Sequence, residues 1–297
     1  MTPREEGFLL LTGYLGDPDR KPLTVAQFRS LTHRARLMER PKADRDITPE
    51  DLLAMGCDRA AALRIVDLLS QTQQLQWYLE KGRRAGCVPV TRVSENYPDR
   101  VRRGLGLDAP GVLWAKGDLS LLNTPKISLV GSRDLEKENR AFAREVGVQA
   151  AYQGYTLVSG GARGADRTAQ SSCLEHGGKV ICVVADQLEA HPLQENVLYL
   201  SETGFELPFS AHRALQRNRV IHCLGSKTFV AQCTLGKGGT WDGTGKNLRF
   251  GWSPVFCLDD GSTASRELEQ RGAVLISLGS LQDIEALQNN VMNFIDQ

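Results

Sequence analysis

The chain has 297 residues, of which 41% are hydrophobic and 24% are charged. This is the composition of an ordinary soluble globular protein, with length for one large domain and one smaller one. Lys+Arg 36 against Asp+Glu 35 leaves a net charge of +1, which excludes capture of a polyanion by the field of the whole protein. A nucleic-acid partner would need a local basic patch.

Seven cysteines are present, and no two of them have C-x-x-C spacing. This pattern predicts buried free thiols in a reducing compartment and no zinc site. The apolar run Phe8–Leu11 is too short for a signal peptide or a membrane segment. We therefore expect a cytoplasmic protein that makes no membrane contact and uses no metal or cofactor.

Residues 1–86 are predicted to form a small helical module. The helical patterns are Thr24–Met38, a short segment opened by Thr48 and Pro49, Arg59–Leu69 and Thr72–Arg84. Between the first two, the charged and proline-containing run Glu39–Asp46 is predicted to be an exposed loop. The apolar spacing is that of a helical bundle, and no residue of the module is a candidate for chemistry.

In the main domain, residues 87–297, short apolar strands alternate with amphipathic helices. Strand patterns cover Cys87–Thr91, Lys126–Val130, Thr156–Val158, Val180–Ala185, Thr228–Cys233, Val255–Leu258 and Ala273–Ile276. Helical patterns cover Glu136–Gln153, Asp166–His176, Asn196–Gly204, Ser210–Cys223, Thr263–Arg271 and Ser280–Ile295. This alternation predicts an α/β fold of the Rossmann-like, doubly wound type with a mostly parallel sheet.

Two of these strands run directly into small-residue turns that carry an arginine. Lys126–Val130 is followed by Gly131-Ser132-Arg133, and Thr156–Val158 is followed by Ser159-Gly-Gly-Ala-Arg-Gly164. Because the carboxyl ends of parallel strands lie at one edge of the sheet, both turns fall where ligands bind. Glycine lets backbone N–H groups approach an anion, and arginine binds phosphate from the side. The sequence therefore predicts a phosphate-binding surface.

Two further loops, Ala185-Asp186 and Gly236–Thr240, are expected at the same edge. The helical segment Ser210–Cys223 adds Arg213, Arg217, Asn218 and Arg219, of which Asn218 and Arg219 could present an amide and a guanidinium to a sugar-phosphate backbone. Asp166 is predicted first of all to be the N-cap of the helix that it begins.

Enzyme motifs fit the chain poorly. There is no G-x-x-x-x-G-K-[ST] loop, no G-x-S-x-G nucleophile elbow and no pair of carboxylates within the glycine loops. An anion-binding surface without a catalytic constellation predicts a binding protein and not an enzyme.

Several of these motifs resemble those of the DprA/Smf family of DNA-processing proteins. The resemblance runs from about Tyr97 to Ile276 and rests on Tyr97-Pro98, Gly131-Ser-Arg133, Val158–Asp166, Gly177-Gly-Lys179 and Arg217-Asn-Arg219. It implies a SAM-like helical module ahead of an extended Rossmann-like domain. It also implies a homodimer that binds single-stranded DNA and helps to load a RecA-type recombinase, in DNA-mediated transformation, recombination or related DNA processing.

In that family the arginine of the first loop, the second loop and the lysine after the paired glycines line the DNA pocket, and this implies a place for Lys179 as well. The expected DNA- and phosphate-binding residues are Gly131, Ser132, Arg133, Ser159, Gly160, Gly161, Ala162, Arg163, Gly164, Lys179, Asn218, Arg219, Lys237, Gly238, Gly239 and Thr240. The chain departs from the family at Gln232, where a glutamate is usual, and in residues 234–250, which read as a glycine-rich loop. Trp241 and Phe250 are candidates for base stacking.

Two alternatives stay open. Rossmann-like folds with such loops also serve as nucleotide-sensing modules of bacterial defence systems, and a sensor would bind one mononucleotide with little salt dependence. Nucleotide phosphoribohydrolases share Gly238-Gly-Thr240 but need a glutamate a few residues later, and none occurs before Glu267. A DNA-binding protein is distinguished from both by an affinity that grows with strand length and falls steeply with salt.

Overall fold

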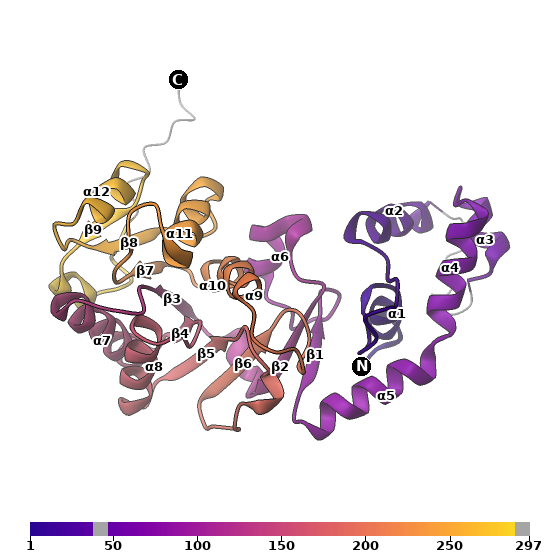
Figure 1. Ribbon diagram of the computed structural model, residues 1–297, viewed down its shortest axis with the longest axis horizontal. Coiled ribbons are helices and arrows are strands. Elements are labelled where there is room, and N and C mark those ends of the chain that lie inside the picture. The colour runs from indigo at the N-terminus through magenta and orange to yellow at the C-terminus, as the bar shows by residue number, and fades with distance from the viewer. Residues whose placement is uncertain (38–46, 289–297) are drawn as a thin grey trace. The chain divides into compact units, whose positions relative to one another are not determined.

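The computed structural model describes residues 1–37 and 47–288, so the loop predicted at Glu39–Asp46 lies outside the described residues. The chain forms two compact units (Figure 1). One consists of Met1–Tyr97 and Pro110–Leu113, and the other of Pro98–Ala109 and Trp114–Gln297. The division lies later in the chain than the boundary predicted at residue 86.

The first unit is helical, as the sequence predicts. It contains α1 (Pro3–Thr12), α2 (Val25–Arg36), α3 (Pro49–Ala54), α4 (Arg59–Ser70), α5 (Thr72–Arg84) and the short strand β1 (Val88–Thr91). Thr2, Thr24 and Thr48 each form a capping box, in which the threonine hydroxyl accepts a hydrogen bond from the third helical residue. Capping satisfies backbone donors that would otherwise be left open where each helix begins.

The second unit is built on a mostly parallel sheet, which confirms the predicted fold class. Its strands are β2 (Val112–Gly117), which begins in the first unit, β3 (Lys126–Val130), β4 (Thr156–Ser159), β5 (Lys179–Val183), β6 (Val197–Ser201), β7 (Thr228–Val230), β8 (Val255–Leu258) and β9 (Val274–Ile276). From β2 onward the order is β2-β6-β5-β4-β3-β7-β8-β9. Only the β2–β6 pair among these is antiparallel.

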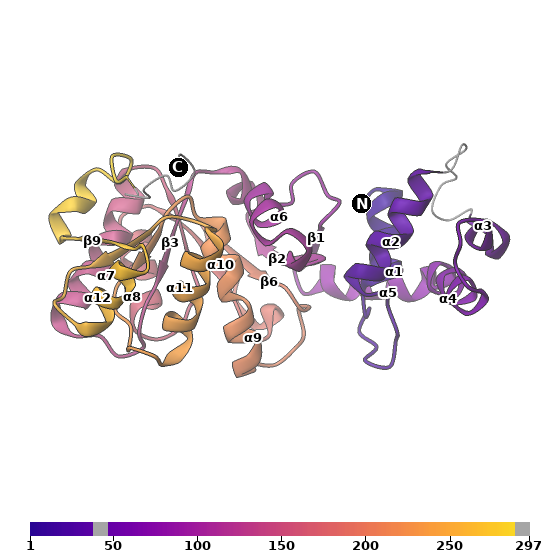
Figure 2. The ribbon, with the colours of Figure 1, turned by 90° about the horizontal axis from the view of Figure 1, so that it is seen from above.

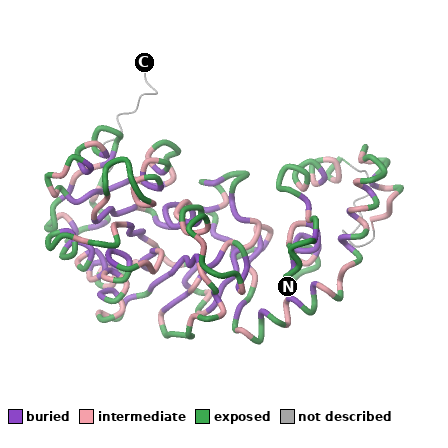
Figure 3. Tube along the Cα trace, viewed as in Figure 1, coloured by how far each residue is buried: buried purple, intermediate pink, exposed green. Residues whose placement is uncertain are grey.

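Helices cover both faces of this sheet (Figure 2). They are α6 (Asp99–Leu105), α7 (Lys137–Tyr152), α8 (Ala165–Glu175), α9 (Ala211–Gln216), α10 (Asn218–Leu224), α11 (Gly238–Phe250) and α12 (Thr263–Gln270). On one face Phe142 and Val146 of α7 pack with Ile127 and Leu157 of the sheet. On the other, Ser128 Oγ donates to a backbone carbonyl of α10 at 2.6 Å. The strands are accordingly buried along most of their length (Figure 3).

Three element predictions in this unit are wrong. The segment predicted as a helix at Asn196–Gly204 contains β6, because its short run of apolar and aromatic residues pairs with both β5 and β2. Residues 234–250, predicted as a loop, contain the helix α11. The closing helix predicted at Ser280–Ile295 is replaced by a 3₁₀ turn, Leu278–Gln282, and residues 289–297 lie outside the described part.

All seven cysteines are free, and five of them are buried, as the sequence predicts. Among the described residues, none of the helices combines the length and hydrophobicity that a membrane crossing requires.

A buried histidine makes the stability of this unit depend on pH. His222 of α10 is 0% exposed, and burial and then the charge of Arg217 lower its pKa to about 3. In the unfolded chain the pKa of a histidine is about 6.5, so between these values only the unfolded state takes up the proton. We expect the free energy of unfolding to fall below pH 6.5, by at most about 1.4 kcal/mol per pH unit from this group.

The measurement is urea unfolding between pH 7 and pH 4, with His222→Gln as the comparison. The variant should be less stable than the wild type at pH 7, because its side chain loses the contact of Nδ1 with Asn247 Nδ2 (3.2 Å). It should lose less stability on acidification. Equal pH dependence in the two proteins would show that His222 does not carry this effect.

Candidate nucleic-acid interface

The candidate surface is the edge at which the parallel strands end. Gly131 follows β3 and Gly160 follows β4, which are parallel neighbours. The chain continues from β3 to β4 on one side of β3, and β7 lies on the other side, so the strand order reverses at β3. Open α/β sheets bind ligands at this kind of switch point. The first glycine loop, Gly131–Arg133, emerges there.

The two glycine loops pack directly against each other. The N–H of Ala165, at the end of the second loop, donates to Ser132 O of the first at 3.1 Å. Gly164 has φ +87, and a Cβ atom there would lie 2.3 Å from Arg133 O. Gly131 is equally enclosed, since its Cβ would lie 2.4 Å from the Cβ of Ala165. The structure therefore brings the two predicted loops together, and glycine is what permits the contact.

The second loop, Ser159–Gly164, is filled from inside by an acidic side chain. Asp166 Oδ2 accepts hydrogen bonds from the N–H groups of Gly160 and Ala162, both at 3.1 Å. Asp166 is 6% exposed, and burial raises its pKa against the opposing effects of the Arg217 charge and these two N–H groups. The prediction that Asp166 is the N-cap of α8 is wrong, because Gly164 holds that position. Two of the predicted phosphate donors are thus used by the protein itself.

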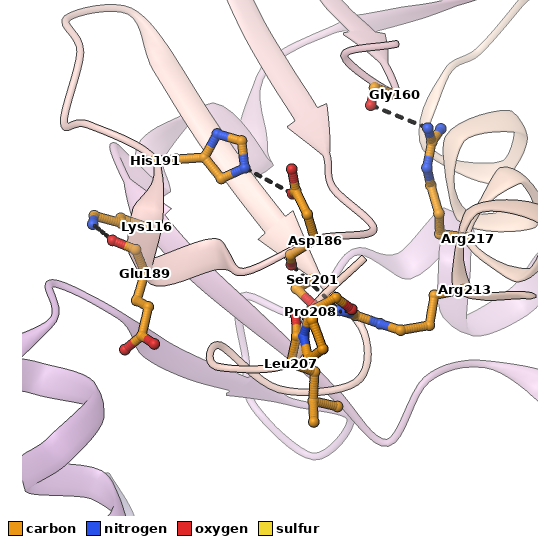
Figure 4. Close-up of polar contacts among 10 residues, drawn as sticks. All are labelled: Lys116, Gly160, Asp186, Glu189, His191, Ser201, Leu207, Pro208, Arg213 and Arg217. Carbon is orange, nitrogen blue, oxygen red and sulfur yellow. Dashed lines mark hydrogen bonds and ion pairs between the residues drawn. The ribbon is translucent and has the colours of Figure 1, made fainter. Parts of the chain in front are cut away.

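Arg217 holds the second loop at Gly160 (Figure 4) and, through Asn218, links it to the start of α11. Its Nη2 donates to Gly160 O at 3.0 Å and its Nη1 to Asn218 Oδ1 at 3.2 Å. Asn218 Nδ2 in turn donates to Gly239 O at 3.1 Å. The predicted residues Asn218 and Gly239 therefore belong to one connected group with the second loop, but the amide of Asn218 is already engaged on both sides.

The arginines on either side of Arg217 are also occupied. Arg213 donates to the carbonyls of Leu207 at 2.7 Å and Pro208 at 2.6 Å and to Ser201 Oγ at 3.1 Å (Figure 4). Arg219 forms an ion pair of 2.5 Å with Glu202, whose side chain is only 5% exposed. Burial raises the pKa of Glu202, and the charge of Arg219 opposes this. These side chains support the surface more than they offer cations to a ligand.

Three predicted cations remain accessible at this edge. Arg133 is exposed, and in the described part of the chain no hydrogen bond or ion pair holds its guanidinium. Arg163 is paired with Asp134 at 2.7 Å, but both side chains are largely exposed, at 71% and 88%. Such a pair is worth little, so a phosphate can replace Asp134 at small cost. Lys237 is exposed as well.

Lys237 stands beside the open amino end of α11. It is the N-cap residue of a helix of 13 residues, and among the described residues no side chain caps the first turn. The backbone N–H groups of Gly238, Gly239 and Thr240 are therefore available to an anion, and the partial positive charge of the helix end favours one. Free backbone N–H groups for an anion are therefore found at the start of α11, whereas those of Gly160 and Ala162 in the second loop are bonded to Asp166.

Lys179 is not brought to this surface. It is the first residue of β5 and pairs with Thr156, the first residue of β4, which itself pairs with Lys126 at the start of β3. Because these strands are parallel, Lys179 lies at the opposite edge of the sheet. Asp186, which follows β5, does lie at the candidate edge, where its carboxylate contacts His191 Nε2 at 2.8 Å (Figure 4).

A shallow cavity of about 350 Å³ lies beside the first loop. It is lined by Glu136, Lys137, Glu138, Asn139, Gln232, Cys233, Asp260 and Ser262. Gln232 accepts a hydrogen bond from Ser132 N–H through its backbone carbonyl and one from Glu136 N–H through its side chain. The acidic side chains make this cavity unsuitable for phosphate, so the anion-binding surface ends at the first loop. No group of three metal-ligating side chains occurs in the described residues.

Comparisons with known proteins agree with this geometry. The family model of DNA recombination-mediator protein A matches residues 89–277. The DNA processing protein DprA of Streptococcus pneumoniae is 34% identical over 193 residues, which cover 60% of this chain and 67% of that protein. Both glycine loops and Arg217-Asn-Arg219 lie within the residues that the family model matches.

Solved structures share the fold. The X-ray structure of DNA processing protein A from Streptococcus pneumoniae is similar with a TM-score of 0.69 at 24% identity, over 95% of this chain and 96% of that one. DNA processing protein A from Helicobacter pylori, whose structure was described for its single-stranded DNA binding mode, has a TM-score of 0.56 at 23% identity, over 66% of this chain and 94% of that one.

Proposed function

Because the chain belongs to the DNA recombination-mediator protein A family, as its resemblance to DprA/Smf proteins predicts, we propose that it binds single-stranded DNA along the carboxyl edge of its sheet. The observation that supports this most is the first glycine loop, which carries an unoccupied arginine at the switch point of the sheet. The relative from Helicobacter pylori is described as binding single-stranded DNA.

In this proposal, phosphates are held by side-chain cations and by one helix end. Arg133 and Arg163 hold phosphates beside the glycine loops, and Lys237 holds one at the amino end of α11, where the first-turn N–H groups are open. These contacts carry no base information, so binding depends weakly on sequence. Gly131, Gly160 and Gly164 contribute by letting the loops pack closely, and Arg217 and Asn218 by fixing them.

The wider role follows from the family and is part of the same proposal. A protein that holds a strand mainly through its phosphates leaves most of the bases accessible for pairing, which suits the loading of a recombinase during DNA uptake or recombination. Chemistry on the DNA is not required for this role, and self-association as a dimer would place two such surfaces on one strand.

The test is a titration of labelled single-stranded DNA, duplex DNA and a mononucleotide at several salt concentrations. With about three phosphate contacts, the logarithm of the affinity for a single strand should fall with that of the salt concentration with a slope of about −2. Arg133→Gln and Lys237→Gln should each weaken binding roughly tenfold and reduce the slope by about 0.7.

Lys179→Gln is the matched control, because it removes one exposed charge from the opposite edge of the same sheet. Its affinity and salt slope should stay at the wild-type values. If Lys179→Gln lost as much affinity as Arg133→Gln, the strand would not follow the edge proposed here. A wild-type protein that binds the mononucleotide as tightly as the long strand would be a nucleotide sensor.

A further inference from the structure

An exposed aromatic ring stands at the same edge of the sheet, outside every predicted site. Phe209 is 57% exposed and belongs to the β6–α9 loop, residues 202–210. Because β6 is parallel to β5, this loop leaves the sheet at the edge where the glycine loops lie. From β3 to β6 there are three strand spacings of about 4.8 Å, so about 14 Å separates the first loop from the start of the β6–α9 loop.

The β6–α9 loop is held firmly in place. Arg213 Nη1 donates to the carbonyls of Leu207 and Pro208, directly before Phe209, and its Nη2 reaches Ser201 Oγ and Asp186 O (Figure 4). Phe205 is 0% exposed. Glu189 N–H donates to its carbonyl at 3.0 Å. A loop fixed in this way loses little conformational entropy when a ligand binds.

The ring of Phe209 has no aromatic partner among the described residues, unlike the two stacking candidates suggested by the sequence. Phe250 is stacked on Trp252, with centroids 5.6 Å apart and planes at 19°. Trp241 lies under the Arg271 guanidinium, 4.9 Å from its centroid. A large apolar ring that is exposed, free and attached to a rigid loop is suited to accept the flat face of a second ring.

We propose that Phe209 is the stacking platform for the bases of the bound strand. This rests on the proposed function, in which the phosphates of the strand bind the cations at the neighbouring strand ends. Base–aromatic stacking does not depend on which base is present, so it adds affinity without sequence preference. The guanidinium of Arg213 positions the loop and does not itself contact the strand.

The experiment compares oligothymidylate with an abasic oligonucleotide of equal length. Wild-type protein should bind oligothymidylate roughly tenfold more tightly than the abasic strand, the size of effect expected for one lost stack. Phe209→Ala should bind both strands with the weaker affinity, and its salt slope should match that of the wild type because no phosphate contact is removed. Phe209→Trp should restore the preference for bases.

Phe250→Ala is the matched control, since Phe250 is 59% exposed on the same unit but already stacked on the protein. It should retain the wild-type preference. The inference is overturned if Phe209→Ala keeps that preference, or if it weakens binding to both strands equally. Wild-type protein that binds both strands equally tightly overturns the stacking role alone, whereas wild-type protein that binds neither strand overturns the proposed function as well.

Discussion

Replacement of Gly164 by alanine is expected to destabilise the second unit by about 3 kcal/mol and to abolish tight DNA binding. Two effects add at this position. An L-residue at φ +87 and ψ −123 is strained by about 1–3 kcal/mol, and the added Cβ would lie 2.3 Å from Arg133 O and 2.4 Å from Ser132 O. These neighbours are backbone atoms, so relief requires movement of the first loop, at about 1–3 kcal/mol.

Gly154→Ala separates the two effects. Gly154 has a similar φ of +75, but no atom lies within 4 Å of the position of its Cβ. It should therefore cost only the backbone strain, about 1 kcal/mol, and leave DNA binding unchanged. Urea midpoints and single-strand affinities of the two variants would be measured side by side. Equal losses of stability would mean that the contact between the loops has no energetic weight.

The two glycine loops could be located from the sequence because strand, turn and helix each leave a local signal. Short apolar runs predict β3 and β4, and the glycines with an arginine mark the turns that follow. The parallel pairing of β3 with β4 then places both turns at one edge. What the sequence does not contain is which N–H groups stay free, since the filling of the second loop by Asp166 depends on side-chain direction.

For Lys179, the family motif and the strand direction give different positions relative to the glycine loops. The residue is the first of an otherwise apolar strand, and the amino end of a parallel strand lies opposite to the ligand-binding edge. The family motif nevertheless drew it into the predicted site. The sheet places about the length of a strand between Lys179 and the glycine loops.

The prediction for α11 failed because its glycines serve packing between helices. A Cβ at Gly243 would lie 3.2 Å from His222 Nε2, and one at Gly239 would lie 3.1 Å from Leu215 Cδ2. Each glycine destabilises a helix by about 1 kcal/mol relative to alanine, so a segment with several glycines is predicted to be a loop. Close approach of α9 and α10 to α11 compensates for that loss, and such tertiary contacts are not visible in a single sequence.

Loss of the Arg217 charge is expected to have the other large effect on stability. Arg217 is 7% exposed, and it and Asp166 both hold Gly160, one through the carbonyl and the other through the N–H. Arg217→Gln would remove the charge that favours ionisation of the buried Asp166 and the hydrogen bond to Gly160 O, which together should cost about 2–3 kcal/mol. Asp166→Asn should also be destabilising, because it removes the negative charge near the Arg217 guanidinium.

Removal of both charges should cost less than the sum of the single changes, with a coupling free energy of about 2 kcal/mol in a double-mutant cycle measured by urea unfolding. Arg163→Gln is the surface comparison, since its ion pair with Asp134 is exposed and should contribute less than about 1 kcal/mol. Additive losses for Asp166 and Arg217 would refute the coupling.

The salt dependence of DNA binding shows whether Arg217 contacts phosphate or only holds the second loop in place. A cation that touches phosphate changes the salt dependence of binding when it is removed, whereas a buried cation that only holds the loop changes the affinity at every salt concentration alike. Because Arg217 bonds Gly160 O and Asn218 Oδ1, Arg217→Gln should weaken binding to folded protein with an unaltered salt slope. Arg133→Gln should lower the slope, so the two arginines, close together in the fold, would be separated by a single measurement.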